Sequence, residues 1–506
     1  MTETVDVKKL NEVHAHVDAS KSVCHELSDF FSFYVPGHQY MQKFKQKMWD
    51  GRIRLFSPQG TLYNGLLPHL QHFCEQRDYE LTIDPAFDLI VEEKDVLESY
   101  IKNLAVYNEE AKQITPYPEQ IQAFVEALHK GKRTILSPTA TGKSLIIYCI
   151  CHYLINKQID DNKKILIVVP TTNLVSQLKD NFTEYSLHDE NFDAETLVHR
   201  IPQDKSKDSN KQIYCSTWQS IYKMPRTFFA QFDAIIGDEC HEYEAKSIKG
   251  ILEKSTDAFF RIGLTGTLRD SKTNKLQIEG SFGPSIQVTT LKKAINDNRT
   301  SKIDIQFRHL LYNKVSHKAM SKMKYHDEIE FLFDHKNRNK YIASIALSRQ
   351  NQNTLILVQR IKHLNELHKL IELGNKKFNK NYNVISVSGD STDDERSHAR
   401  QIIDSVEEAS NTIIIATFGV FQRGISMRKL DNIIFGAPSK SLVRVLQSIG
   451  RGLRKAEGKE QLTLFDLVDD VVQNKKKNYS FNHGMERLKI YQNEQLPFKI
   501  KKLSIE

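Results

Sequence analysis

The sequence predicts an α/β protein with two tandem parallel-sheet domains that follow a small α+β domain. The chain has 506 residues, which at about 150 residues per domain is the length of roughly three domains. From about Thr134 onward, short β-branched runs alternate with helical stretches, the pattern of parallel sheets covered by helices. Residues 1–100 lack this alternation and show short strands, turn signals and one or two helices.

The composition is that of an ordinary globular protein. Hydrophobic residues make up 40% and charged residues 26%, with 21 Gly and 13 Pro, which excludes a collagen-like or wholly disordered chain. Lys and Arg (71) exceed Asp and Glu (63) by eight, a mild basic bias that suits a polyanion partner without requiring one. The longest apolar stretches, 145–151 and 165–170, are far shorter than the ~20 residues of a membrane-spanning helix, so no membrane partner is expected.

The N-terminal residues and the cysteines predict a cytoplasmic protein. Residues 1–6 have neither the basic start nor the apolar block of a signal peptide. The six cysteines include no C-x-x-C pair, which indicates reduced thiols rather than a disulfide frame or a zinc site. Cys149 and Cys151 lie in an apolar helical stretch, and we expect both to be buried.

Short β-branched runs mark the strands of the two α/β domains. The first set is 134–136, 165–169, 213–216, 234–236 and 261–264, and the second is 354–358, 384–387, 412–416, 432–435 and 462–466. We expect the small domain at 1–100, the α/β domains at 101–295 and 296–470, and a linker near 290–302, which is rich in Lys, Asn and Asp. The basic C-terminal segment 471–506 either grips phosphates or forms a solvated helical tail.

A phosphate-binding loop follows the first predicted strand of the first α/β domain. Residues 137–144 read SPTATGKS between a strand and an apolar helix, with Ser137 in place of the usual first Gly. Backbone N–H groups at such a helix start bind phosphates, Lys143 neutralises the β/γ oxygens, and the Ser144 hydroxyl can hold Mg²⁺. The predicted cofactors are therefore ATP and Mg²⁺, with binding residues Pro138, Thr139, Ala140, Thr141, Gly142, Lys143 and Ser144.

A second carboxylate-bearing strand supports this interpretation. Residues 232–237 form an apolar run that ends in Asp238-Glu239-Cys240-His241, at the strand edge where parallel sheets carry active sites. Asp238 would hold the Mg²⁺ shell, and Glu239 would orient and deprotonate the attacking water. A helix N-cap Asp with a first-turn Glu is the simpler alternative, but the phosphate loop earlier in the chain favours the catalytic interpretation.

The ordered motifs resemble those of the superfamily two DExH helicases, which implies two RecA-like domains and an ATP-driven motor. Tyr117 and Gln120 match the adenine-binding element, and 265–267 matches the coupling element. The elements implied to contact nucleic acid carry Thr171, Thr172, Thr217, Trp218, Arg360, Ser388, Gly389 and Thr417. For Trp218, a packing anchor is the commoner role of a Trp in a strand-to-helix loop, ahead of a base-stacking platform. Gly424 matches a nucleotide-side position, and Ser426 stands where many relatives carry Asp.

The last motif supplies candidate arginine fingers. Arg451 and Arg454 are three residues apart, on one side of a helical turn, and planar guanidinium groups stabilise charge that develops on a γ-phosphate. Gln447, one turn earlier, could reach the triphosphate or His241. An exposed basic helix would show the same spacing. The predicted catalytic set is Lys143, Asp238, Glu239, Gln447, Arg451 and Arg454.

Residues 43–56 of the small domain interleave basic and aromatic side chains. Asp50-Gly51 is a hairpin turn signal, and Arg52 and Arg54 share one strand face. With Lys47 and Trp49 they could bind duplex phosphates, or they could form an exposed edge strand that uses charge to resist aggregation.

Nearly the whole chain closely resembles the recombination helicases of T-even-like phages. This resemblance implies a monomer in the cytoplasm of an infected bacterial host. It also implies an ATP-dependent DNA helicase acting on branched DNA and RNA–DNA hybrids (Holliday junctions, stalled forks, D-loops and R-loops) in recombination, repair and replication. Phage recombination or single-strand-binding proteins are candidate protein partners. The alternatives are an RNA-directed DExH helicase, a duplex DNA translocase without branch preference, and a binding protein that uses ATP only as a switch.

Overall fold

The computed structural model describes residues 3–505 apart from several internal segments. Those outside the description are 36, 109, 139–140, 159–162, 202, 205–208, 243–249, 267–271, 314–322, 389–410, 420–428, 439–440, 442–444, 446–447, 451, 454–458 and 472–477. The chain forms two compact units that meet in sequence at Thr289 and Thr290. Each unit is described by itself below.

The first unit opens with a small α+β domain. Its four-stranded sheet has the order β5-β2-β1-β6, with β1 (Thr4–Lys9), β2 (His14–Ala19), β5 (Thr61–Tyr63) and β6 (Glu80–Ile83). Alternate residues of β1 and β2 are buried against α1 (Lys21–Phe30) and α3 (Leu67–Glu75). A separate two-stranded sheet pairs β3 (Ser32–Tyr34) with β4 (Arg52–Arg54).

The connection between β3 and β4 differs from the expected tight hairpin. It contains the short helices η1 (His38–Tyr40) and α2 (Gln42–Lys45), so Asp50-Gly51 does not close a two-residue turn. Gly51 has a φ of +82°, and its position ends the connection instead. The hairpin prediction is wrong because a left-handed glycine marks a sharp bend without fixing the length of the connection.

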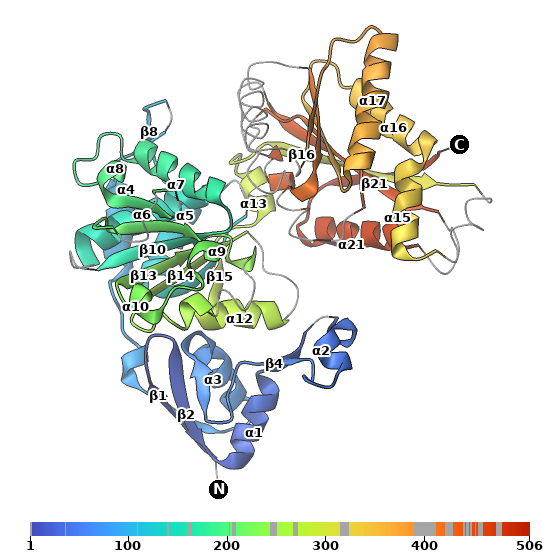
Figure 1. The fold of residues 1–506 in the computed structure, drawn as a ribbon. Helices are drawn as coiled ribbons and strands as arrows, with labels where there is room; N and C mark the ends of the chain where they lie inside the picture. Colours follow the sequence, from blue (N-terminus) through green and yellow to red (C-terminus); the bar gives the residue numbers. More distant parts are fainter. Residues whose placement is uncertain are drawn as a thin grey trace. The chain divides into compact units, whose positions relative to one another are not determined.

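A parallel seven-stranded sheet completes the first unit (Figure 1). Its order is β11-β12-β10-β13-β14-β9-β15, and Figure 1 labels β10, β13, β14 and β15 among these strands. The strands are β9 (Lys132–Leu136), β10 (Lys164–Val169), β11 (Val198–Ile201), β12 (Ile213–Thr217), β13 (Phe232–Gly237), β14 (Phe260–Thr265) and β15 (Ser285–Gln287). Ile165 and Ile167 join one core and Leu166 and Val168 join another, because successive side chains of a strand point to opposite faces.

Helices cover both faces of this sheet. One core includes residues of α5 (Pro118–His129), α6 (Lys143–Tyr153), α7 (Thr172–Tyr185) and α8 (Ala194–Leu197), and α4 (Lys94–Asn103) packs on α5. The other includes residues of α9 (Trp218–Ile221), α10 (Arg226–Phe229) and α12 (Lys272–Phe282). Cys149 and Cys151 are buried in α6, as predicted. A short hairpin of β7 (Val106–Tyr107) and β8 (Gln113–Ile114) precedes α5.

The second unit is built on another parallel seven-stranded sheet, of order β18-β19-β17-β20-β21-β16-β22. Its strands are β16 (Lys302–Leu311), β17 (Thr354–Val358), β18 (Asn383–Val387), β19 (Thr412–Thr417), β20 (Asn432–Phe435), β21 (Gln461–Asp470) and β22 (Phe498–Ser504). Residues of α16 (Lys336–Leu347) and α17 (Ile361–Lys377) belong to one core, and residues of α13 (Leu291–Asn296) and α21 (Tyr479–Asn493) to the other. Every predicted strand is present, which confirms the predicted fold class.

Two segments are more ordered than the sequence suggested. The expected linker near 290–302 contains α13, whose Leu291 and Ala294 are buried. The basic C-terminal segment is not a solvated tail, because α21 buries Arg487 and Tyr491 against Asp466 of β21 and β22 pairs with β16. The number of charged residues in a segment does not reveal such packing when only a few of its positions are apolar and buried.

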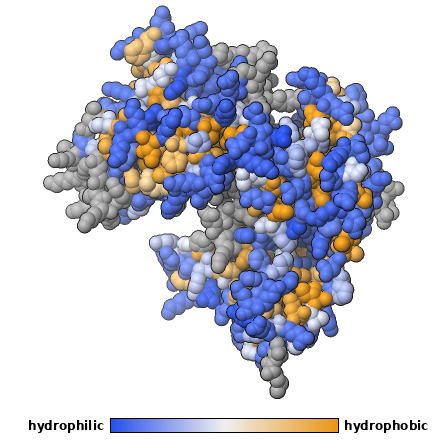
Figure 2. Space-filling model, turned by 180° about the vertical axis from the view of Figure 1, so that it is seen from behind, coloured by the Kyte–Doolittle hydropathy of each residue, from blue (hydrophilic) through white to orange (hydrophobic). Residues whose placement is uncertain are grey.

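The surface is largely hydrophilic on the face that Figure 2 shows, with hydrophobic areas between the charged ones. Among the described residues, no helix combines the length and the apolar character that crossing a bilayer requires.

Candidate functional site

The described part of the phosphate loop lies between β9 and α6. Ser137 is buried and its N–H donates to the Thr265 carbonyl at 2.9 Å. Gly142 precedes the first residue of α6 with a φ of +78°, a conformation that favours glycine. Gly142, the N-cap residue, has no side chain that could cap the start of α6, so the N–H groups of the first turn can bind an anion. Thr139 and Ala140 lie outside the described residues.

The predicted adenine-binding element packs directly against this loop. Gln120 is 4% exposed, and its Oε1 accepts the Tyr117 N–H at 2.8 Å at the start of α5. A Cβ on Gly142 would lie 2.4 Å from Gln120 Nε2, so only glycine fits between the two elements. Tyr117 is 42% exposed, as suits a ring that would lie against a base. The fold thus places Gln120 beside Gly142 of the predicted phosphate loop.

Lys143 meets the carboxylate strand at the same edge of the sheet. Its Nζ lies 3.0 Å from Glu239 Oε1 and 3.4 Å from the Ser137 carbonyl. Glu239 lies two residues after the end of β13, which is separated from β9 by β14 alone, and its φ is +47°. A positive φ is costly for a side chain other than glycine and is often found at functional sites. Asp238 Oδ1 accepts the Glu239 N–H at 3.0 Å.

The carboxylate of Glu239 is held in its ionised form. Burial alone would raise its pKa, but the positive charge of Lys143, the neighbouring His241 and the Gly266 N–H together lower it. His241 Nδ1 lies 3.4 Å from Glu239 Oε2 and 2.5 Å from Thr265 Oγ1. The predicted coupling element is therefore connected to Glu239 through His241. The sequence does not indicate the contact between His241 and Thr265, because the two residues are not adjacent in the chain.

Ser144 and Asp238 supply a hydroxyl and a carboxylate, which are the hard oxygen ligands that Mg²⁺ prefers. Their chemistry fits the predicted metal, and Asp238 is anchored by its N–H, which donates to the Val168 carbonyl at 2.9 Å. The Ser144 hydroxyl is hydrogen-bonded to Tyr185 Oη at 3.0 Å. The contact between Tyr185 and Ser144 could not be predicted from the sequence, because Tyr185 lies at the far end of α7.

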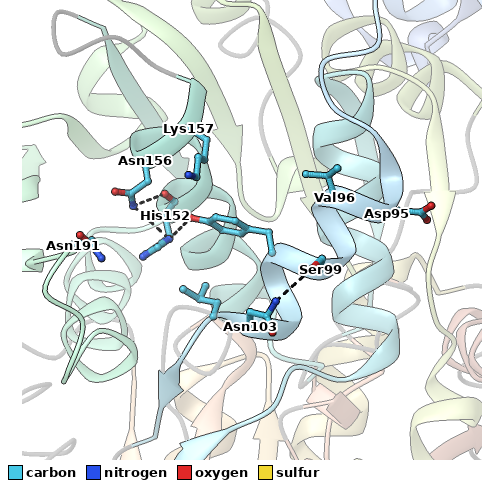
Figure 3. A pocket seen from close by; sticks show the side chains of 10 residues that line it. Asp95, Val96, Ser99, Asn103, His152, Asn156, Lys157 and Asn191 are labelled. Atoms are coloured by element: carbon cyan, nitrogen blue, oxygen red, sulfur yellow. Dashed lines mark hydrogen bonds between the residues drawn. The ribbon is translucent and has the colours of Figure 1, made fainter.

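A polar network lies farther along α6. Tyr148 and His152 follow Ser144 at helical spacing on one face, and Asp189 Oδ2 contacts Tyr148 Oη at 3.3 Å and His152 Nε2 at 2.7 Å. Tyr100 closes the network at 2.7 Å from His152 Nδ1. Beside it, a pocket of about 810 Å³ lies between α4 and the end of α6 (Figure 3). None of the predicted site residues lines this pocket.

The predicted nucleic-acid residues of the first unit follow neighbouring strands. Thr171 lies two residues after β10 at the N-cap position of α7, but its side chain makes no capping hydrogen bond and no described residue pairs with its buried Oγ1. Thr172 opens α7. Thr217 ends β12 and its Oγ1 bonds Ser220 Oγ at 2.9 Å. Trp218 is half-buried against the second core. Because β10 and β12 are adjacent and parallel, these residues share one sheet edge.

In the second unit, the predicted nucleic-acid residues that the structure describes share a sheet edge in the same way. Arg360 follows β17 and lies 3.8 Å from Glu330 through its Nε, Ser388 follows β18, and Thr417 ends β19. These three strands are neighbours in the sheet. The predicted residues Gly389, Gly424, Gln447, Arg451 and Arg454, with Ser426, lie outside the described residues.

The basic face of the small domain carries less free charge than the sequence suggests. Arg54 forms a two-pronged ion pair with Asp50, one contact of which measures 3.3 Å. Arg52 stacks at 4.6 Å over the Tyr34 ring. Trp49 Nε1 donates to the Arg52 carbonyl at 2.8 Å, and Lys47 is exposed.

The small domain packs on α12, directly after the coupling element. Leu276 of α12 is part of its hydrophobic core. His69 and Glu279 lie 2.8 Å apart, and Tyr63 Oη donates to Glu253 at 2.5 Å. This contact leaves no signal in the sequence, because the residues are far apart along the chain.

Comparison with known proteins gives matches along most of the chain. The family models are the res subunit of type III restriction enzymes at 109–270, the N-terminal domain of DNA helicase UvsW at 4–84 and the helicase conserved C-terminal domain at 337–456. The ATP-dependent DNA helicase uvsW of Enterobacteria phage T4 is 31% identical, over 97% of this chain and 98% of the relative.

Solved structures agree with the sequence matches. The crystal structure of T4 UvsW matches with a TM-score of 0.53 and 30% identity, over 99% of this chain and 100% of that one. The Mycobacterium smegmatis helicase Lhr, solved with single-stranded DNA and AMP-PNP, matches with a TM-score of 0.52 over 76% of this chain and 49% of its own. Its identity of 15% supports a likeness in fold alone.

Proposed function

The chain belongs to the family of the phage DNA helicase UvsW and is an ATP-driven helicase, and from this premise we propose that its substrates are branched DNAs. These are Holliday junctions, stalled forks, D-loops and R-loops formed in phage recombination, repair and replication. The protein would act as a monomer in the cytoplasm of the infected host, with phage recombination or single-strand-binding proteins as partners.

The observation that carries the ATPase assignment is the ion pair of Lys143 with Glu239 at 3.0 Å. It joins the phosphate loop to the residue proposed to activate water. When ATP enters, its phosphates would compete for Lys143, and the N–H groups of α6 would bind the same anion. Ser144 and Asp238 would hold Mg²⁺, which neutralises charge on the β- and γ-phosphates.

Loss of the Lys143 contact would make Glu239 a better base. Burial raises the pKa of Glu239, and the Lys143 charge opposes that effect. Once Lys143 turns to the phosphates, burial is opposed less, and the pKa of Glu239 rises toward the range in which a carboxylate accepts a proton from water. The contacts of His241 with Glu239 and with Thr265 would transmit this change to the coupling element.

The remaining roles complete the motor. Arg451 and Arg454, with Gln447 and Gly424, would act on the nucleotide from the second α/β domain. Thr171, Thr172, Thr217, Trp218, Arg360, Ser388, Gly389 and Thr417 would contact one strand, mostly through phosphates. The small domain, with Lys47, Trp49, Arg52 and Arg54, would recognise the branch, and its packing on α12 supports a role close to the coupling element.

The test is ATP turnover without nucleic acid and with a four-way DNA junction, single-stranded DNA or an RNA duplex with a single-stranded tail. Junction DNA is expected to stimulate turnover most, and Arg52→Ala with Arg54→Ala is expected to reduce junction stimulation more than stimulation by single strands. Equal stimulation by all DNAs would favour a duplex translocase, and preference for RNA would favour an RNA helicase. No stimulation by any nucleic acid would refute the proposal.

A further inference from the structure

A cluster of basic side chains lies at the edge of the second sheet. Arg308 of β16 pairs in register with Lys501 of β22, and Gln306 pairs with Lys499. Side chains at paired positions of parallel strands project from the same face. Arg349, which follows α16, lies 4.6 Å above the Phe465 ring. Arg308 lies 5.9 Å from the same ring, so two guanidinium groups share one aromatic side chain, and Lys499 and Lys501 project from the same face of the sheet.

The two guanidinium groups are half-buried without matching carboxylates. The Nε atoms of Arg308 and Arg349 are buried, and no described residue accepts a hydrogen bond from either. Burial and the neighbouring Arg308 charge lower the pKa of Arg349. The nearby carboxylate, Asp304, accepts from Gln306 and lies 3.9 Å from Lys499. Like charges held together in this way indicate a site that an anion would stabilise.

Protection against aggregation explains only part of the cluster. Exposed lysines on an edge strand discourage pairing with other chains, which accounts for Lys499, Lys501 and Lys502. It does not account for Arg308 and Arg349, because half-burying two like charges costs free energy and protects no edge.

We propose that Arg308, Arg349, Lys499 and Lys501 form a second phosphate-binding surface, which holds the sugar-phosphate backbone of the nucleic acid on which the helicase acts. Guanidinium groups bind phosphate oxygens in two-pronged geometry, and the lysines extend the contact as point charges. Lys499 is 78% exposed, so the surface is an open track suited to a polymer rather than a closed pocket for a free anion.

This surface is distinct from the motif residues of the same unit. In the sheet, β22 lies four strands from β17, which precedes Arg360, a separation of ~19 Å at ~4.8 Å per strand. A nucleic-acid backbone bound both at this surface and at the motif residues would be held at a point outside the translocation path. The inference rests on the proposed function only in requiring that the protein bind nucleic acid.

The experiment measures binding of a labelled four-way DNA junction to the full-length chain by fluorescence anisotropy, from 50 to 200 mM salt without nucleotide. The variants are Arg308→Gln with Arg349→Gln and, separately, Lys499→Gln with Lys501→Gln. Each pair is expected to weaken binding several-fold and to lower the slope of log affinity against log salt by about 1 to 2, because each lost phosphate contact removes about 0.9.

Lys502→Gln is the matched control, since Lys502 lies on the same strand but pairs with His309 on the opposite face. It is expected to leave affinity and slope unchanged. The exposed lysine pair keeps the test valid if the arginine pair disturbs folding. Unchanged slopes in both pairs would overturn the inference. Failure of the unmodified chain to bind any DNA would instead refute the proposed function.

Discussion

Replacement of Glu239 by Gln removes the negative charge that faces Lys143 while nearly keeping the shape of the side chain. The two side chains are 15% and 9% exposed and their charged atoms lie 3.0 Å apart. Glu239 also faces His241 at 3.4 Å. The substitution therefore separates two effects, the loss of a base and the release of a lysine.

The loss of the base slows ATP hydrolysis, whereas the release of Lys143 favours ATP binding. A positioned general base contributes about 10²- to 10⁴-fold to a rate, so DNA-stimulated ATP turnover should fall by that factor. ATP affinity should stay within a few-fold of the unmodified protein or become tighter, because the phosphates no longer compete with Glu239 for Lys143. Lys143→Ala should weaken ATP binding instead, while sparing much of the DNA binding.

The assay pairs steady-state ATP turnover with equilibrium binding of a fluorescent ATP analogue. Glu126→Gln is the matched control, since Glu126 is 11% exposed and also pairs with two cations, Lys94 and Arg133, away from the phosphate loop. It should leave both readouts unchanged. Turnover of the Glu239 variant within about tenfold of the unmodified protein, or a loss of ATP binding, would refute the reasoning.

Three further predictions follow from packing and charge. Gly142→Ala should weaken ATP binding about tenfold, because a φ of +78° costs an alanine about 1–2 kcal/mol and its Cβ would meet Gln120 Nε2 at 2.4 Å. A double-mutant cycle with Gln120→Ala should show coupling, and additive effects would contradict it. Burial lowers the pKa of Lys459, which donates to the Gly452 carbonyl, to about 8. Between pH 8 and 10 the unfolded chain holds more protons at this residue than the folded chain does, so stability to urea should rise with pH, and Lys459→Met should remove that rise; an unchanged slope would refute the assignment. Leu276→Ala should destabilise the packing of the small domain by about 2–3 kcal/mol, seen as a lower thermal midpoint and faster proteolysis, whereas an unchanged midpoint would show that Leu276 does not hold the domain.

The strands at the centre of each sheet could be predicted because they are continuous apolar runs buried on both faces. Short apolar runs such as 165–169 and 412–416 are typical of strands in parallel sheets whose two faces are both covered by helices. The strands that the sequence did not reveal, β11, β15, β16 and β22, lie at or near sheet edges or carry charged residues. Edge strands are half-exposed, so their hydrophobic pattern is weak.

The sequence alone determined which residues end the central strands, and hence that Gly142, Lys143, Asp238 and Glu239 meet at one edge, because parallel strands place their carboxyl ends together. Only the tertiary structure decided what surrounds them. Tyr185 beside Ser144, Leu276 inside the small domain and the arginines over Phe465 depend on helix packing between distant segments. Such contacts are set by side-chain fit in three dimensions, which no local pattern in the chain records.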